Sequence, residues 1–148
     1  MMKVSQKCQY GLRAVYELAK RYGNGPVAVA DVAKVQAIPP RFLELILRQL
    51  RQGGIVESRR GPQGGYTLAV RPDQLTIGRV IRFFDGPLAP VSCVAEEPST
   101  ECPLHGRCAF LPMWERAREA VSAVFDTTTF QGLVESEKEM RYVPSYSI

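Results

Sequence analysis

One stretch constrains the fold more than any other: a helical pattern that changes abruptly into a strand pattern within residues 39–68. A Pro-Pro pair begins it at Pro39, where the missing amide hydrogen of a proline does not weaken a helix start. Apolar residues then recur every three or four positions until a Gly-Gly pair at Gly53, which predicts an amphipathic helix. Residues 55–56 and 66–68 favour strands, so the sequence predicts a hairpin directly after this helix.

The turn of the predicted hairpin is basic and rich in glycine. Arg59 and Arg60 are followed by glycines at 61, 64 and 65, which permit positive φ and close approach to another backbone. The run lacks the Lys-Ser/Thr ending of a phosphate-binding loop, and no helix begins after it. We therefore interpret the turn as a basic surface and not as a nucleotide site.

Two helices are predicted upstream, at about residues 5–22 and 30–36. Ser5 can cap the first, and the Gly-Asn-Gly-Pro run at 23–26 ends it. Helix, short helix, helix and hairpin is the order of a winged helix-turn-helix, whose recognition helix enters the DNA major groove. The predicted fold class is mainly α with a small β-hairpin wing.

The chain is predicted to divide into three parts. Residues 1–88 form the winged helix-turn-helix domain, closed by a fourth helix at about 77–84 that Thr76 caps. Residues 89–111 are predicted to be a loop that contains three of the four cysteines. Residues 112–148 are predicted to hold a long C-terminal dimerisation helix and a C-terminal segment.

The dimerisation helix is predicted from one apolar row at 3-4-3 spacing, which is typical of the a and d positions of a helical seam. Its residues are Trp114, Ala117, Val121 and Val124. The row predicts a helix that has one apolar seam and ends near Asp126. A shorter helix capped around Thr128 is predicted to follow it.

The basic residues gather in the first half of the chain, which has a net charge of +4 and a pI of about 9.0. In the first turn of the predicted recognition helix, Arg41 can pair with guanine and Glu44 can accept from cytosine N4. Arginines of the hairpin turn can reach the adjacent minor groove or its phosphates. We predict a double-stranded DNA operator as partner, bound by Arg41, Glu44, Arg48, Arg59, Arg60 and Gln63.

Three of the four cysteines, Cys93, Cys102 and Cys108, lie within sixteen residues. The sequence contains no long apolar stretch and no signal-peptide pattern, so we expect a cytoplasmic protein with reduced thiols and no membrane partner. Clustered thiols there indicate metal or redox chemistry, and zinc is disfavoured because paired C-x₂₋₄-C spacing is missing. The chain has one histidine and no recognisable nucleophile–base set, so we expect neither an enzyme nor a small-molecule substrate.

Several segments resemble the bacterial Rrf2-type regulators over about residues 2–134. They are MKVSQKCQYGLRAVYELA, IPPRFLELILRQLRQGGIVESRRGPQGGYTLA, IGRVIRFFDGP and DTTTF. The resemblance implies a homodimeric winged-helix repressor, in which Glu44 discriminates between DNA sites and Arg60 enters the minor groove. In many members three loop cysteines hold an iron–sulfur cluster, and Trp114 matches the tryptophan of the family's dimerisation helix.

That resemblance implies that Cys93, Cys102 and Cys108 hold an iron–sulfur cluster, with [2Fe–2S] preferred over [4Fe–4S]. Through this cluster the regulator would sense cluster status, redox state or nitric oxide. We expect the cluster loop to pack beside the DNA-binding element. An alternative is a cluster-free repressor controlled by thiol oxidation or by a protein or metabolite partner, since the CymR type within the family lacks these cysteines.

The fourth cluster ligand stays open. Eight residues separate Cys93 from Cys102, more than is usual in IscR-like members, and Leu111 stands where those members have a histidine. The NsrR type takes a ligand from the first helix of the partner subunit, at the position of Gln9 here. His105 and Cys8 are the leading candidates. The others are an exogenous ligand, no fourth ligand, or one of the acids Glu96, Glu97 and Glu101.

Overall fold

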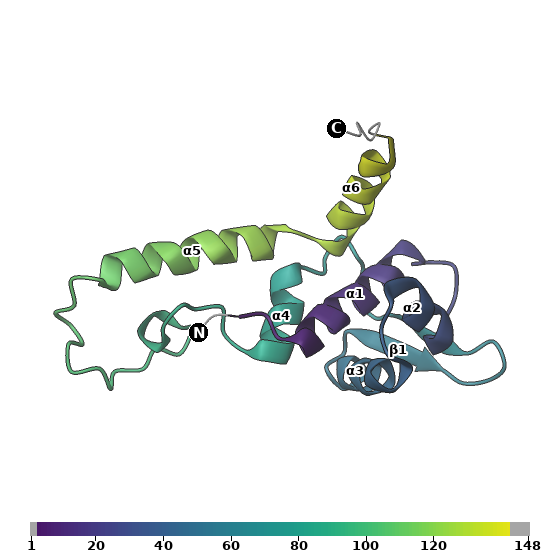
Figure 1. Ribbon diagram of the computed structural model, residues 1–148, viewed down its shortest axis with the longest axis horizontal. Helices are drawn as coiled ribbons and strands as arrows, with labels where there is room; N and C mark the ends of the chain where they lie inside the picture. Colours follow the sequence, from purple (N-terminus) through teal and green to yellow (C-terminus); the bar gives the residue numbers. More distant parts are fainter. Residues whose placement is uncertain (1–2, 143–148) are drawn as a thin grey trace.

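The structure is a computed structural model that describes residues 3–142. Its elements are α1 (Gln6–Lys20), α2 (Val29–Gln36), α3 (Pro40–Gln52), β1 (Val56–Arg59), β2 (Gly65–Leu68), α4 (Ile77–Asp85), the 3₁₀ turn η1 (Ser92–Val94), α5 (Leu111–Thr127) and α6 (Phe130–Tyr142). Helices α1 to α4 and the hairpin form one body, from which α5 extends to one side (Figure 1). The predicted fold class, a winged helix-turn-helix followed by a long C-terminal helix, is confirmed. Residues 143–148 of the predicted C-terminal segment lie outside the described residues.

The core of the body forms between α1, α2, α3 and the hairpin. Helix α3 contributes four buried side chains at the helical spacing that the sequence predicts: Leu43, Ile46, Leu47 and Leu50. Phe130, the first residue of α6, is also fully buried there, and its N–H donates to the carbonyl of Leu75 at 3.1 Å. The chain therefore returns to the body after α5, and the start of α6 is part of the same core.

The hairpin is anchored to the body by backbone hydrogen bonds. Its register pairs Val56 with Leu68 and Arg59 with Gly65. Val27, before α2, exchanges two backbone hydrogen bonds with Tyr66, at 2.8 and 2.9 Å. A Cβ atom on Gly65 would lie 2.1 Å from the carbonyl oxygen of Val27, so only glycine permits this approach.

The helix caps follow local sequence signals with small differences. Ser5 Oγ accepts from the N–H of Cys8 at 3.1 Å, and Thr76 Oγ1 accepts from the N–H of Arg79 at 3.2 Å, as predicted. Helix α6 is capped by Thr129, whose Oγ1 accepts from Gly132 at 3.0 Å, one residue later than predicted. Helix α1 ends at Lys20, before the predicted Tyr22, because the last turn tightens into i→i−3 hydrogen bonds.

No helix among residues 3–142 is both long enough and apolar enough to cross a membrane.

Candidate DNA-binding surface and cysteine loop

The outward face of α3 carries the side chains that the sequence predicts to read DNA. Arg41, Glu44 and Arg48 are exposed, because the opposite side of the helix is buried in the core. In the part of the chain that the structure describes, none of the three side chains forms an ion pair or a hydrogen bond with another residue. They are free to bind an external ligand.

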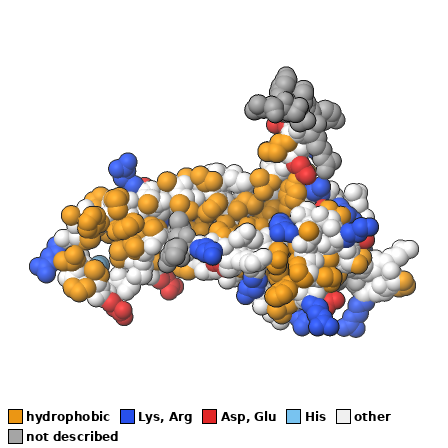
Figure 2. All heavy atoms as spheres, in the orientation of Figure 1, with side chains coloured by type: hydrophobic (Ala, Val, Ile, Leu, Met, Phe, Trp, Pro, Cys, Tyr) orange, Lys and Arg blue, Asp and Glu red, His pale blue; other side chains and the backbone are white. Residues whose placement is uncertain are grey.

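The wing presents a second basic group. Arg59 ends β1, and Arg60 and Gln63 lie in the turn that projects from the body beyond the sheet; all three are exposed (Figure 1). Arg51 near the end of α3 donates to Ser58 Oγ of β1 at 3.1 Å, which fastens the hairpin to the helix. Lys and Arg side chains gather along the lower edge of the body, where α3 and β1 lie (Figure 2).

A polar network on α1 sets the turn between α2 and α3. Arg13 donates to the carbonyl oxygens of Gln36 and Ala37, and Ala37 has a left-handed backbone with φ 52°. Glu17 is 2% exposed, forms an ion pair with Arg21 at 3.1 Å, and accepts from Gln36 Nε2 at 3.2 Å. Sequence reasoning missed Glu17, although an acid inside the apolar stripe of α1 was a usable signal.

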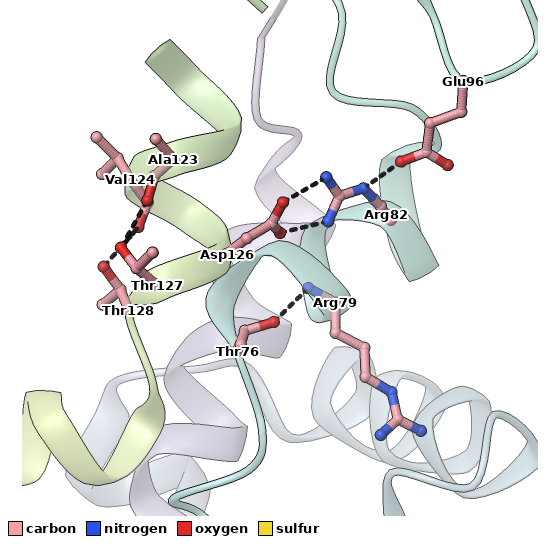
Figure 3. Close-up of polar contacts among 9 residues, drawn as sticks. All are labelled: Thr76, Arg79, Arg82, Glu96, Ala123, Val124, Asp126, Thr127 and Thr128. Carbon is pink, nitrogen blue, oxygen red and sulfur yellow. Dashed lines mark hydrogen bonds and ion pairs between the residues drawn. The ribbon is translucent and has the colours of Figure 1, made fainter. Parts of the chain in front are cut away.

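The first half of the cysteine loop is fastened to α4 and α5. Val94 is buried, and its carbonyl accepts from Arg118 Nη1 of α5 at 3.3 Å. Arg82 of α4 forms an ion pair with Glu96 of the loop at 2.8 Å and a two-pronged pair with Asp126 of α5 at 2.5 and 2.9 Å (Figure 3). The hydrogen bond from Arg82 lowers the pKa of Asp126, and Arg82 thus joins the loop to both helices.

The second half of the loop is open to solvent. Cys102 and His105 are exposed and close one turn, in which the N–H of His105 donates to the carbonyl of Cys102 at 3.0 Å. Cys108 is half-buried, and its carbonyl accepts from Leu111 at the start of α5 at 3.3 Å. Cys93 is half-buried in η1, in the fastened half of the loop.

The donor chemistry of this loop fits an iron–sulfur cluster, because thiolates are the usual ligands of such clusters. Across residues 3–142, no three His, Cys, Asp or Glu side chains lie close enough together to hold a metal ion. The structure thus places the three thiols on one loop but does not bring them together, and ligation by all three requires the open half of the loop to rearrange.

Cys8 differs from the loop cysteines. It is fully buried on α1, in an apolar cluster with Ile81 and Leu88. Burial and the neighbouring carboxylate of Asp85 raise the pKa of the Cys8 thiol to about 12, so it stays protonated at neutral pH. In this conformation Cys8 is closed off from solvent, whereas His105 lies on the same exposed loop as Cys102.

Within one chain, the cysteine loop contacts α4 of the predicted winged-helix domain, as its ion pair with Arg82 shows, but it does not pack beside α3 or the wing (Figure 1). The loop lies along α5, at the end of the molecule opposite the wing (Figure 1). Its ion pair with the body is made through Arg82 of α4. The reason is the path of the chain: after α4 the loop leads away from the body, and the 17-residue helix α5 begins at that far end and runs back toward α6 (Figure 1).

Helix α5 has no buried residue, although it is rich in apolar side chains. Trp114, Ala117 and Val121 are half-buried and Val124 is 60% exposed. Two further residues missed by the sequence analysis, Phe110 just before the helix and Met113 within it, are 61% and 48% exposed. Their spacing to Ala117 and Val124 extends the same row toward the loop.

An apolar groove continues this row where α5 meets α6. It has a volume of about 560 Å³ and is lined mainly by side chains of α1, α5 and α6, among them Leu12, Tyr16, Val124, Phe125, Leu133 and Met140. Hydrophobic side chains cover the upper side of α5 as far as its junction with α6 (Figure 2). The described chain therefore leaves a long apolar surface without cover.

A core-packed recognition helix with an exposed basic face, followed by a basic hairpin, defines a winged-helix DNA-binding protein. The chain belongs to the Rrf2 family, whose model, described as an iron-dependent transcriptional regulator, matches residues 4–136. Two relatives illustrate its range. The transcriptional regulator CymR of Bacillus subtilis is 37% identical and covers 96% of this chain and 100% of its own. The regulator IscR of Aliivibrio salmonicida is 33% identical and covers 84% of this chain and 73% of its own.

Solved structures agree with this assignment. The structure of CymR, titled the global cysteine regulator of B. subtilis, matches with a TM-score of 0.77, 37% identity, and coverage of 92% of this chain and 98% of that one. The structure of T. potens IscR matches with a TM-score of 0.76, 29% identity, and coverage of 98% and 95%. These relatives are regulators of transcription and not enzymes, as the sequence predicts for this chain.

Proposed function

We propose that this protein is a homodimeric repressor that acts in the cytoplasm and binds a double-stranded DNA operator through α3 and the wing. The observation that carries the proposal is the exposed basic surface that α3 and the hairpin form together, fastened by the Arg51–Ser58 hydrogen bond. This surface is exposed and already formed within one chain, so its charges can reach the DNA phosphates.

Each predicted DNA-binding residue has a role that its position supports. Arg41 and Glu44 lie in the first turns of α3, where they can read guanine and cytosine edges in the major groove. Arg48 lies one turn further on the same exposed side. Arg59, Arg60 and Gln63 of the wing are proposed to contact the adjacent minor groove and its phosphates.

The homodimer is proposed to form through α5. A helix of 17 residues with no buried side chain gains little stability from its own chain, and its exposed apolar row needs a partner surface. A second copy supplies such a surface, with Trp114, Ala117, Val121 and Val124 at the interface together with Phe110 and Met113. Two-fold symmetry then presents two recognition helices to two half-sites.

We further propose that Cys93, Cys102 and Cys108 hold an iron–sulfur cluster, with [2Fe–2S] preferred and His105 as fourth ligand. Support comes from the donor set, from the turn that links Cys102 to His105, and from the family's description as iron-dependent. Such a cluster supplies redox and nitric-oxide sensitivity. The protein itself connects the loop to α4 and α5 through the ion pairs of Arg82. A change in the loop can therefore alter the arrangement of the two subunits in the proposed dimer.

A cluster-free thiol switch is the second candidate function. The observations that favour it are the exposure of Cys102 and the separation of the three thiols among the described residues. A relative of known structure, Staphylococcus aureus CymR in its oxidized form, is 34% identical, with a TM-score of 0.70. Since the CymR type lacks the loop cysteines, this relative supports thiol control in general and not a particular thiol of this chain. In this second mechanism, oxidation of a loop thiol of this chain is the signal, in place of the gain or loss of a cluster.

One experiment separates the two mechanisms. The protein is purified without air, and its visible absorption, iron and acid-labile sulfide are measured for wild type, Cys102→Ala and the control Cys8→Ala. A cluster predicts charge-transfer bands that vanish in Cys102→Ala and persist in the Cys8 control. A colourless wild type without iron after reconstitution contradicts the cluster and leaves the thiol switch.

DNA binding is tested separately by selecting operators from a random duplex library. Enrichment of a two-fold symmetric sequence is expected, and its loss in Glu44→Ala or Arg60→Ala would assign specificity to α3 and the wing. A library that shows no enrichment refutes the operator-binding proposal, whatever the state of the cluster.

A further inference from the structure

The outward face of α3 contains one aliphatic side chain among its charged residues. Leu45 is 44% exposed, whereas its neighbours Ile46 and Leu47 are fully buried in the core. It lies four residues after Arg41 and three before Arg48, so these three side chains share one face of the helix. Leu45 thus lies among residues proposed to contact base edges.

Phe42, another exposed apolar residue of α3, lies on the flank nearest α1. Its ring centroid is 6.5 Å from that of Tyr10. Leu45 and Phe42 line an apolar groove of about 300 Å³ beside α1, together with Tyr10 and Lys7. Leu45 therefore stands where the charged face of α3 meets an apolar strip.

The chemistry of Leu45 limits what it can recognise in the major groove. Leucine has no hydrogen-bond donor or acceptor, so against most base edges it would displace water without replacing its hydrogen bonds. The exception is the C5-methyl group of thymine, the apolar feature of the major groove. A leucine beside that methyl buries two apolar groups together.

We propose that Leu45 is a specificity-determining residue that reads thymine through its 5-methyl group, next to the polar readout by Arg41 and Glu44. The inference rests on the proposed function, in which α3 enters the major groove. Removal of one buried methyl group corresponds to about fourfold in Kd, which sets the expected size of the effect.

The test isolates that methyl group. The full-length protein selects an operator from a random duplex library, and each thymine of the operator is then replaced by deoxyuridine, which removes only the methyl group and keeps base pairing and the O4 acceptor. Wild type is expected to lose about three- to fivefold in affinity at one thymine per half-site. Leu45→Ala is expected to bind the thymine and uracil duplexes equally.

Two further variants, one conservative and one control, test whether the thymine preference depends on an apolar side chain at position 45. Leu45→Met retains an apolar side chain and is expected to keep the thymine preference. Val35→Ala truncates an aliphatic side chain of α2 that is 54% exposed, and it is expected to leave the thymine-to-uracil ratio unchanged. If Leu45→Ala does not fold, Leu45→Gln replaces it, because the side chain is exposed and glutamine preserves its reach.

The outcomes are distinct. A wild type that is insensitive to uracil at every position, or a Leu45→Ala variant that keeps the wild-type sensitivity, overturns the assignment of Leu45 and leaves operator binding intact. A library that yields no enriched sequence refutes operator binding, and the inference fails with it.

Discussion

Helices α3 and α5 are both amphipathic, yet their surroundings differ completely. Of the 13 residues of α3, four are buried against the body, whereas none of the 17 residues of α5 is buried. The chain itself fixes α3 and the face it presents. Helix α5 exposes its apolar row and lacks a covering partner within the described residues. The proposed DNA-binding surface is therefore complete in one chain, while the apolar surface of α5 would be covered only in the proposed homodimer.

The largest effect is expected for cysteine reactivity. Cys8 is buried with its pKa raised to about 12, while Cys102 is exposed, so at pH 7.5 Cys102 should react with iodoacetamide about a thousandfold faster or more. Mass spectrometry of the alkylated native protein, treated with a chelator, measures both rates. Equal alkylation rates of Cys8 and Cys102 would show that the N-terminal end of α1 opens as readily as the loop. Denaturation should equalise them and serves as the control.

Charge on the outward row of α5 should remove the dimer. Met113→Glu combined with Val124→Glu places two carboxylates on an apolar surface that a partner would cover, and burial of such charges is strongly unfavourable. We expect a monomer by light scattering and a loss of operator affinity of about a hundredfold or more. Glu119→Gln, on the opposite side of α5, should remain dimeric. A persistent dimer in the double variant would place the interface elsewhere.

Removal of Arg60, an arginine of the wing, should lower the affinity for the operator by a moderate factor. Arg60→Ala loses a charged contact, for which about 1–3 kcal/mol, or roughly 5- to 150-fold in Kd, is typical. Fluorescence anisotropy at two salt concentrations measures the affinity and its salt dependence, which should decrease. Arg79→Ala changes an exposed arginine on α4 and is the matched control. Equal losses in both variants would mean that the wing has no special role.

Truncation of the buried acid of α1 should destabilise the body. Glu17→Ala removes the ion pair with Arg21 and the hydrogen bond from Gln36, and we expect a loss of about 1–2 kcal/mol in the free energy of unfolding. Urea denaturation measures it. Glu57→Ala, an exposed acid of β1, should change stability little. A neutral Glu17→Ala would show that Arg13 alone holds the turn between α2 and α3.

The smallest effect is expected at the junction of α4 and α5. Arg82→Ala removes the ion pairs to Asp126 and Glu96, which are partly exposed, so less than about 1 kcal/mol of stability should be lost. Because Arg82 lowers the pKa of Asp126, this contribution is present above the ordinary carboxyl pKa and is lost as pH falls below it. The stability difference between wild type and Arg82→Ala should therefore shrink on acidification. A difference independent of pH would assign the effect to packing.

Local signals in the sequence were sufficient for most of the body. Pro40 begins α3, and Ser5 and Thr76 cap α1 and α4, because these features depend on neighbouring residues alone. The same is true of the β-favouring residues and the glycine-rich turn that predict the hairpin. The exposed arginines of α3 follow from the spacing of its buried leucines, so this part of the candidate site was predictable as well.

Other features depend on contacts between residues far apart in the chain. Arg82 and Asp126 are 44 residues apart, and the contact between Gly65 and Val27 joins the wing to the segment before α2. The burial of Cys8 and the return of Phe130 to the core are of the same kind. No periodicity encodes such contacts, since they arise when several elements pack against one another.

The sequence thus determined the elements, their order, the charged face of α3 and the three thiols of one loop. The tertiary structure decided where that loop lies, which cysteine is buried and which face of α5 stays uncovered. The physical reason is the separation in sequence over which each interaction acts. Backbone capping and helical spacing depend on residues a few positions apart, whereas burial and ion pairing depend on the whole packed chain.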